Sequence, residues 1–174
     1  MARCEKMAAI GRRQFLKGGA LAAGAVAVGT GSARAQSAGP ALARVTYPSN
    51  RLANLADLTV DQPYPVAYPD DAAPGVLLKL GIRVEGGVGP DGDIVGFTTI
   101  CPHKGFPLNY KPSDRTLTCP GHYSIFDVEK GGQQVWGQAT QNLPQYMLRV
   151  DDSGDIYADG VDELLYGRLS NVLG

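Results

Sequence analysis

The sequence contains two short boxes, Cys101-Pro102-His103-Lys104-Gly105-Phe106 and Cys119-Pro120-Gly121-His122-Tyr123-Ser124. Their cysteines and histidines follow the pattern C-x-H, fifteen residues, then C-x-x-H. The chain has only 2 histidines and 3 cysteines, and both histidines and two of the cysteines stand in these boxes. One metal centre held by both boxes accounts for this concentration better than a disulfide with incidental histidines does.

Two thiolates and two imidazoles make an unequal ligand set, because a thiolate brings negative charge to a metal and a neutral imidazole brings none. If both cysteines bind one iron of a two-iron cluster and both histidines bind the other, the oxidised cluster is formally neutral. Such ligation raises the reduction potential to about -150 to +300 mV, against about -400 mV for plant-type ferredoxins. The boxes therefore predict a one-electron redox centre whose electron localises on the histidine-bound iron.

Two other interpretations of the boxes stay open at this point. A structural zinc site uses the same residue types, although zinc fingers usually group like ligands as C-x2-4-C and H-x3-5-H, whereas here cysteine and histidine alternate within each box. A cysteine-histidine nucleophile pair is less well supported, since no third orienting residue accompanies the boxes. Iron analysis and the EPR spectrum of the reduced protein distinguish these sites.

Both boxes resemble those of Rieske proteins, which carry one 2Fe-2S cluster. The segment 98–150 is similar to the small subunit of arsenite oxidase, notably at Cys101-Pro102-His103-Lys104-Gly105-Phe106-Pro107-Leu108 and Cys119-Pro120-Gly121-His122-Tyr123-Ser124-Ile125-Phe126-Asp127. The resemblance implies that Cys101, His103, Cys119 and His122 bind the cluster. It also implies a large molybdenum-containing catalytic subunit as partner, and a cytochrome c or cupredoxin as electron acceptor. This chain would then have no substrate site and no catalytic residue of its own.

The boxes depart from those of quinol-oxidising Rieske proteins at two positions. Those relatives have an extra cysteine in each box, and a disulfide between them braces the two loops. Phe106 and Gly121 stand at these positions here, so this disulfide cannot form. We expect packing of Phe106 and Pro107, together with a loop around Pro144, to brace the cluster instead, and the cluster to be more sensitive to heat than a braced one.

Three further residues near the ligands bear on the reduction potential of the cluster and on docking to a partner protein. Ser124 stands where Rieske proteins place a serine whose hydroxyl donates to a bridging sulfide, and Phe126 replaces a tyrosine that donates to a cysteine sulfur. The chain thus keeps one of the two hydroxyl donors and lacks the other, which predicts an intermediate reduction potential for the cluster. In quinol-oxidising relatives an apolar residue stands at the position of Lys104 and lines the tip that faces the quinol. A lysine there suits docking to a polar protein surface, and a lysine that is simply exposed to solvent is the other open interpretation. The residues expected around the ligands are Lys104, Gly105, Phe106, Gly121, Ser124, Phe126 and Pro144.

The rest of the chain predicts an all-β fold. Short apolar and β-branched runs are separated by Gly, Pro and Asp turns. We expect strands at 76–84, 93–100, 115–118, 124–128, 146–150 and 155–158, with Asp151-Asp152-Ser153-Gly154 closing a hairpin. A short helix is expected at 50–58, a helical turn at 162–169, and irregular chain over the proline-rich remainder of 36–75. The Rieske resemblance specifies a small antiparallel sandwich or barrel with an inserted cluster-binding subdomain at about 98–128.

The first 35 residues have the features of a twin-arginine (Tat) export signal. Arg12-Arg13 and Phe15-Leu16-Lys17 precede an uncharged segment, 18–33, and Ala33-Arg34-Ala35 fits a cleavage site. The uncharged segment falls short of the roughly 20 strongly apolar residues of a spanning helix. We therefore expect a cleaved signal and a folded periplasmic domain at 36–174, although Rieske subunits of cytochrome bc complexes retain an anchor.

The charge balance argues against nucleic acid as a partner. Residues 1–35 hold six of the 16 basic residues and one of the 17 acidic ones, so a processed chain has a net charge of -6. Such a chain does not neutralise phosphates, but it can steer a basic protein partner.

Besides the arsenite oxidase subunit, three functions remain open. A quinol-oxidising Rieske subunit of a cytochrome bc complex is the main alternative, and the missing disulfide weakens it. A dioxygenase ferredoxin also lacks the disulfide but is cytosolic, which disagrees with the leader. A zinc-stabilised binding module is the non-redox possibility.

Overall fold

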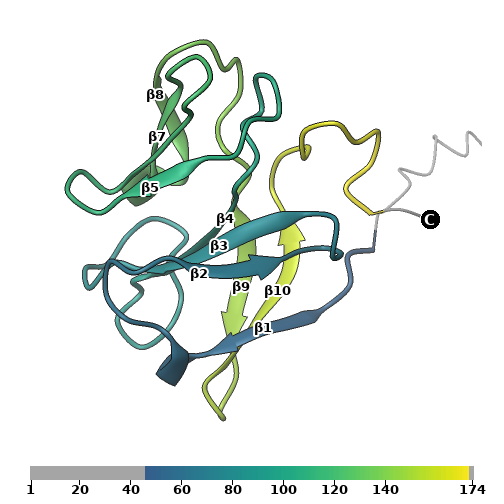
Figure 1. Cartoon of the computed structure of the whole chain (residues 1–174). Helices are drawn as coiled ribbons and strands as arrows, with labels where there is room; N and C mark the ends of the chain where they lie inside the picture. The colour runs from purple at the N-terminus through teal and green to yellow at the C-terminus, as the bar shows by residue number, and fades with distance from the viewer. Residues whose placement is uncertain (1–45, 173–174) are drawn as a thin grey trace, which may run out of the picture. The chain divides into compact units, whose positions relative to one another are not determined.

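The computed structural model describes residues 46–172, so the expected export signal lies outside the described part. This part of the chain consists of strands, two short 3-10 helices and connecting loops (Figure 1). The strands are β1 (Asn50–Asn54), β2 (Tyr64–Ala67), β3 (Pro74–Lys79), β4 (Ile94–Thr98), β5 (Asn109–Lys111), β6 (Thr116–Thr118), β7 (Ile125–Asp127), β8 (Gln133–Trp136), β9 (Tyr146–Val150) and β10 (Asp155–Val161). The 3-10 helices are η1 (Leu55–Asp57) and η2 (Val128–Lys130).

The strands form three antiparallel sheets, which confirms the all-β prediction. Two three-stranded sheets, in the orders β1-β10-β9 and β2-β3-β4, make the base domain. A four-stranded sheet in the order β5-β6-β7-β8 is inserted between β4 and β9. Within residues 46–172, no helix is long and apolar enough to cross a membrane.

Two strands of the base domain, β3 and β4, are apolar runs that are buried on both faces. Every residue of β4 is buried, and in β3 the run from Gly75 to Leu78 is buried as well. Such continuous burial is typical of strands covered on both sides. β4 leads straight into the first box, so a rigid, fully buried strand positions the first candidate ligand.

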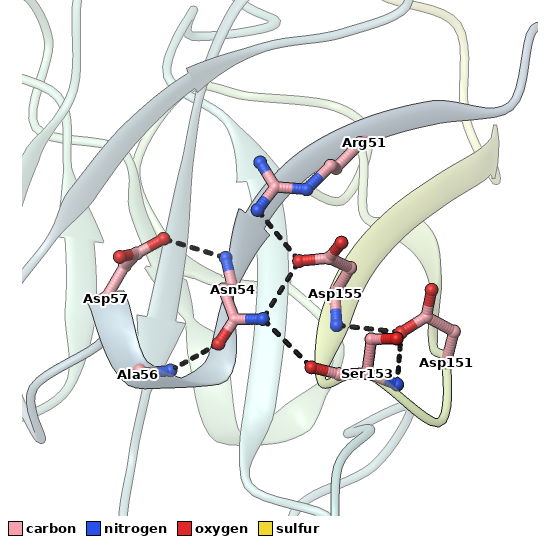
Figure 2. Close-up of polar contacts among 7 residues, drawn as sticks. All are labelled: Arg51, Asn54, Ala56, Asp57, Asp151, Ser153 and Asp155. Atoms are coloured by element: carbon pink, nitrogen blue, oxygen red, sulfur yellow. Dashed lines mark hydrogen bonds and ion pairs between the residues drawn. The ribbon is translucent and has the colours of Figure 1, made fainter.

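A hairpin joins β9 and β10, as predicted, and β1 adds to its outer edge. Asp151 closes the turn, because its carboxylate accepts the backbone N–H groups of Ser153 and Asp155, both at 2.9 Å (Figure 2). Arg51 of β1 donates to the carboxylate of Asp155 at 2.7 Å, which ties the N-terminal strand to this hairpin.

The helix expected at 50–58 is wrong, because this segment forms β1 followed by η1. Asn54 ends the strand and caps η1: its amide oxygen accepts the Ala56 N–H at 3.0 Å, and its own N–H donates to Asp57 at 2.8 Å. The Asn54 side-chain amide also donates to Asp155 at 2.9 Å, as Figure 2 shows. Pairing with β10 overrides the leucine spacing that suggested a helix.

The inserted sheet extends beyond the expected boundary at 128, since β8 pairs with β7. It shares one buried core with β3 and β4 of the base domain, and this core includes Leu117, Phe126 and Leu143 as well as the two box cysteines. The helical turn expected at 162–169 is also wrong. Residues 162–172 form an irregular loop that folds back along the domain.

Candidate metal centre

The first box folds into a tight loop directly after β4. The Cys101 N–H donates to the Phe106 carbonyl at 2.8 Å, and the Gly105 N–H donates to the Cys101 carbonyl at 2.9 Å. Gly105 has a left-handed backbone, with φ of 71°, which glycine adopts without the steric cost of a side chain. The loop therefore presents the two candidate ligands of this box, Cys101 and His103, from a closed turn.

The second box repeats this loop between β6 and β7. The Cys119 N–H donates to the Ser124 carbonyl at 2.8 Å, and the Tyr123 N–H donates to the Cys119 carbonyl at 3.1 Å. Tyr123 stands at the position equivalent to Gly105 and is also left-handed, with φ of 59°. A tyrosine in this conformation is uncommon, and the loop imposes it because the same two hydrogen bonds must close.

The two loops bring like ligands together in space, although cysteine and histidine alternate in the sequence. The His103 and His122 rings lie with their centroids 4.8 Å apart and their planes at 78°. Cys101 and Cys119 are both buried, and their thiols interact with each other. His103 is half-buried and His122 is exposed. The site thus has an inner thiol pair and an outer imidazole pair at the surface.

The environment of the candidate ligands fits a bound metal cluster. Nδ1 of His103 is buried and has no hydrogen-bond partner among the described residues. A buried polar atom without a partner costs free energy, and a metal ion bound to this nitrogen removes that cost. Residues 46–172 contain no point on which three or more His, Cys, Asp or Glu side chains converge. What they offer is two pairs, one for each iron of a two-iron cluster.

Burial and nearby backbone donors have opposite effects on the pKa of the Cys101 thiol. Burial raises this pKa, the backbone N–H groups of His103 and Lys104 lower it, and the neighbouring Cys119 thiol raises it further. A metal-bound cysteine is a thiolate. Donors aimed at its sulfur therefore stabilise the metal-bound form, and hydrogen bonds to sulfur also tune the potential.

Ser124 is fully buried behind the second box. Its hydroxyl oxygen accepts the backbone N–H groups of Gln138 at 3.1 Å and Ala139 at 3.0 Å. A hydroxyl has two acceptor sites and one proton to donate. With both acceptor sites occupied, that proton is left to point toward a further acceptor.

Phe106 and Gly121 lie against each other across the two loops. A Cβ atom at Gly121 would come within 2.9 Å of Cδ2 of Phe106, so the ring occupies the space beside the glycine. The Phe106 ring also meets the His122 ring edge to face, with centroids 5.8 Å apart. Phe106 thus joins the first loop to the second at the two positions where quinol-oxidising Rieske proteins have cysteines.

The remaining predicted residues surround this site. Lys104 is exposed beside the first histidine, while Phe126 is fully buried in the core next to the thiol pair. Pro144 is buried, and its carbonyl accepts the Thr98 N–H of β4 at 3.1 Å. The loop around Pro144 is therefore fastened to the strand that leads into the first box.

Two contacts were not predicted from the sequence. Gly137 packs on the backbone of Ser124, since a Cβ there would lie 2.4 Å from the Ser124 Cα. The only signal in the sequence was the glycine itself, whose φ of 98° and close approach a residue with a side chain would not adopt. Tyr166 lies on Gly105, but nothing in the local pattern around Tyr166 indicates this contact.

Comparison with known proteins agrees with the fold and identifies the family. Residues 56–147 match the Rieske [2Fe-2S] domain family, and the chain belongs to this family. It accordingly carries one Rieske-type 2Fe-2S cluster. The iodate reductase subunit IdrB of Denitromonas iodatirespirans is 39% identical over 171 residues, which cover 96% of this chain and 89% of that protein.

Two further relatives place the chain within the family. The soluble domain of Rieske protein II (soxF) from Sulfolobus acidocaldarius superposes with a TM-score of 0.63 at 26% identity, covering 71% of this chain and 82% of that one. The cytochrome bc1 complex Rieske iron-sulfur subunit of Corynebacterium efficiens is 39% identical over 70 residues, but these cover only 40% of this chain and 17% of that protein.

The contact between Phe106 and Gly121 predicts the effect of adding the missing disulfide. A Phe106→Cys/Gly121→Cys variant should lose its cluster more slowly on heating than the wild type, because a covalent bond replaces packing between the two loops. The half-life of the visible absorbance at a fixed elevated temperature measures this. Equal half-lives for the two proteins, with the new disulfide confirmed by mass spectrometry, would contradict the prediction.

Phe126→Tyr is expected to raise the midpoint potential. Phe126 is fully buried in the core that contains both box cysteines, so an added hydroxyl has few other groups to bond. One hydrogen bond to sulfur is worth about 1 kcal/mol, or about 40 mV for a one-electron couple. A potentiometric titration checks this, and an unchanged or lowered midpoint would refute the argument.

Proposed function

We propose that this chain is the electron-transfer subunit of an exported oxidoreductase. Cys101 and Cys119 bind the inner iron of the cluster, and His103 and His122 bind the outer one. A Rieske cluster accepts and releases one electron at a time at a comparatively high potential. The observation that carries the proposal is the pairing of like ligands, with the imidazole pair at the surface.

The arrangement of the ligands suits exchange of electrons with other proteins. The buried thiol pair holds the site in the core, while the outer imidazole pair lies where a partner protein can approach. Lys104, exposed beside His103, gives this surface a positive charge that suits a polar or acidic partner surface. The chain thus serves as a relay, and the substrate is bound and converted on another subunit.

The partner that best fits is a large molybdenum-containing catalytic subunit. The similarity of both boxes to the small subunit of arsenite oxidase supports arsenite oxidation, with a periplasmic cytochrome c or cupredoxin receiving the electrons. The twin-arginine pattern supports this location, because the Tat route exports folded proteins and so allows the cluster to be inserted before export.

Iodate reduction is the second candidate, and a specific observation favours it. The IdrB relative is similar to the chain over almost its whole length. In that case electrons flow the opposite way, from a soluble donor through this subunit to the catalytic subunit. The same relay surface serves both directions, so the two candidates differ in the large subunit and in the potential required.

Purification of the native complex from the periplasmic fraction tests these proposals. We expect the full-length chain to co-purify with a large subunit that contains molybdenum. The complex is then assayed for arsenite oxidation with oxidised cytochrome c and for iodate reduction with a reduced donor. A complex with neither activity, or a chain recovered alone with zinc, would overturn the proposal.

A quinol-oxidising role receives less support. The described cysteines, Cys101 and Cys119, are both free, and the similarity to a cytochrome bc1 subunit covers only 40% of the chain. Phe106 and Gly121 also fill the positions of the bracing disulfide. Co-purification with cytochrome b and quinol-dependent reduction would be required to restore this alternative.

A further inference from the structure

We propose that the C-terminal loop 162–172 is a strap that holds the first cluster-binding loop in place, with Tyr166 as the positioning residue. The proposal rests on the ligand assignment above. It adds a second brace to the contact between Phe106 and Gly121, and this brace comes from outside the inserted sheet. In Figure 1 the C-terminal loop runs back beside the loop that follows β4.

The strap is fastened to the base domain by a partly buried ion pair. Both terminal nitrogens of Arg168 bind the carboxylate of Asp70, at 2.6 and 2.8 Å. The Arg168 side chain is only 11% exposed, so this two-point pair is held more rigidly than an ordinary surface ion pair. Arg168 also donates to the Asn171 carbonyl at 3.2 Å, which links the anchor to the end of the strap.

A single asparagine closes the strap into a compact loop. The side chain of the buried Asn171 accepts the Leu165 N–H at 2.7 Å and donates to the Glu163 carbonyl at 2.7 Å. It also donates to the hydroxyl of Tyr47 at 2.9 Å. Leu165 is buried in the base core. Asn171 therefore links three separate points of the chain, which fixes the shape of the loop.

The start of the strap is fastened beside the proline loop. The Asp162 carboxylate accepts the Gln145 N–H at 2.7 Å, directly after Pro144. The Gln141 side chain donates to the Leu164 carbonyl at 3.1 Å. The strap is thus joined both to the base domain and to the loop that packs behind the second box.

Tyr166 is the strap residue that reaches the first box. A Cβ atom at Gly105 would lie 2.5 Å from Cε1 and 2.9 Å from Cδ1 of Tyr166, so the ring lies flush on the glycine. Gly105 closes the turn that holds Cys101. Because the strap is anchored on both sides of Tyr166, its ring limits outward movement of this turn. The first box is therefore clamped between Tyr166 on one side and the second loop on the other.

Hydrogen exchange and cluster loss test the strap in the full-length protein. Tyr166→Ala should increase amide exchange in 101–106 while leaving 119–124 unchanged, and should shorten the cluster half-life with a chelator by about fivefold, the size of a typical single destabilising substitution. Tyr166→Phe keeps the ring and should behave as the wild type. Leu164→Ala, an exposed side chain of the same strap, is the matched control.

The outcomes separate the strap from the ligand assignment. Exchange is compared between proteins of matched metal content, so it reports on the strap whichever residues bind the metal. Unchanged exchange in 101–106 in Tyr166→Ala would overturn the strap. So would equal increases in both boxes, which would indicate general destabilisation. Arg168→Lys leaves Tyr166 intact but loses the two-point anchor, and should reproduce the change in 101–106.

Discussion

Replacing His103 and His122 together by cysteine is expected to lower the midpoint potential by about 250 mV or more, the gap between Rieske and all-cysteine clusters. The two imidazoles are the outer ligand pair, at the surface. Two thiolates in their place add two negative charges, and each makes a further electron harder to accept.

The measurement is a potentiometric titration of the double variant after its iron content has been shown to match the wild type. Lys104→Gln is the control for a simple change of local charge, because it removes one positive charge beside His103 without touching a ligand. Lys104 is exposed, so solvent and salt screen its charge, and we expect a small shift. A double variant that retains the wild-type potential would show that the histidines do not bind iron.

The loops that carry the two boxes could be predicted from the sequence because the hydrogen bonds that close them are local. Each box closes within six residues, between a cysteine N–H and the carbonyl of Phe106 or Ser124. The strands on either side of the inserted sheet, β4 and β9, were also predicted, since both are apolar or β-branched runs between turn residues. Where neighbours in the sequence decide the structure, the prediction held.

The missed features depend on partners far away in the chain. β5 and β8 are short, partly polar strands that form by pairing with β6 and β7, so their own composition gives little signal. β1 was predicted to be a helix because the sequence gives no indication of its pairing with β10. The contact between Tyr166 and Gly105 joins residues 61 positions apart, and no periodicity marks it.

Ser124→Ala is expected to lower the midpoint potential by about 60 to 130 mV, the value of one hydrogen bond to a charged group of 1.5–3 kcal/mol for a one-electron couple. The hydroxyl accepts two backbone N–H groups, from Gln138 and Ala139, so its own proton is free to donate. In Rieske proteins the serine at this position donates to a bridging sulfide. Loss of that donor removes stabilisation from the more negative, reduced form.

The same replacement has a second effect that must be separated from the first. Alanine leaves the Gln138 and Ala139 N–H groups without their acceptor, and an unpaired buried group costs about 1–3 kcal/mol. Denaturant unfolding measures this loss, while the potential of the intact protein measures the donor. The Phe126→Tyr variant acts in the opposite direction, so the double variant should return toward the wild-type midpoint. A Ser124→Ala protein that keeps the wild-type midpoint but unfolds more easily would show that Ser124 only supports the loop.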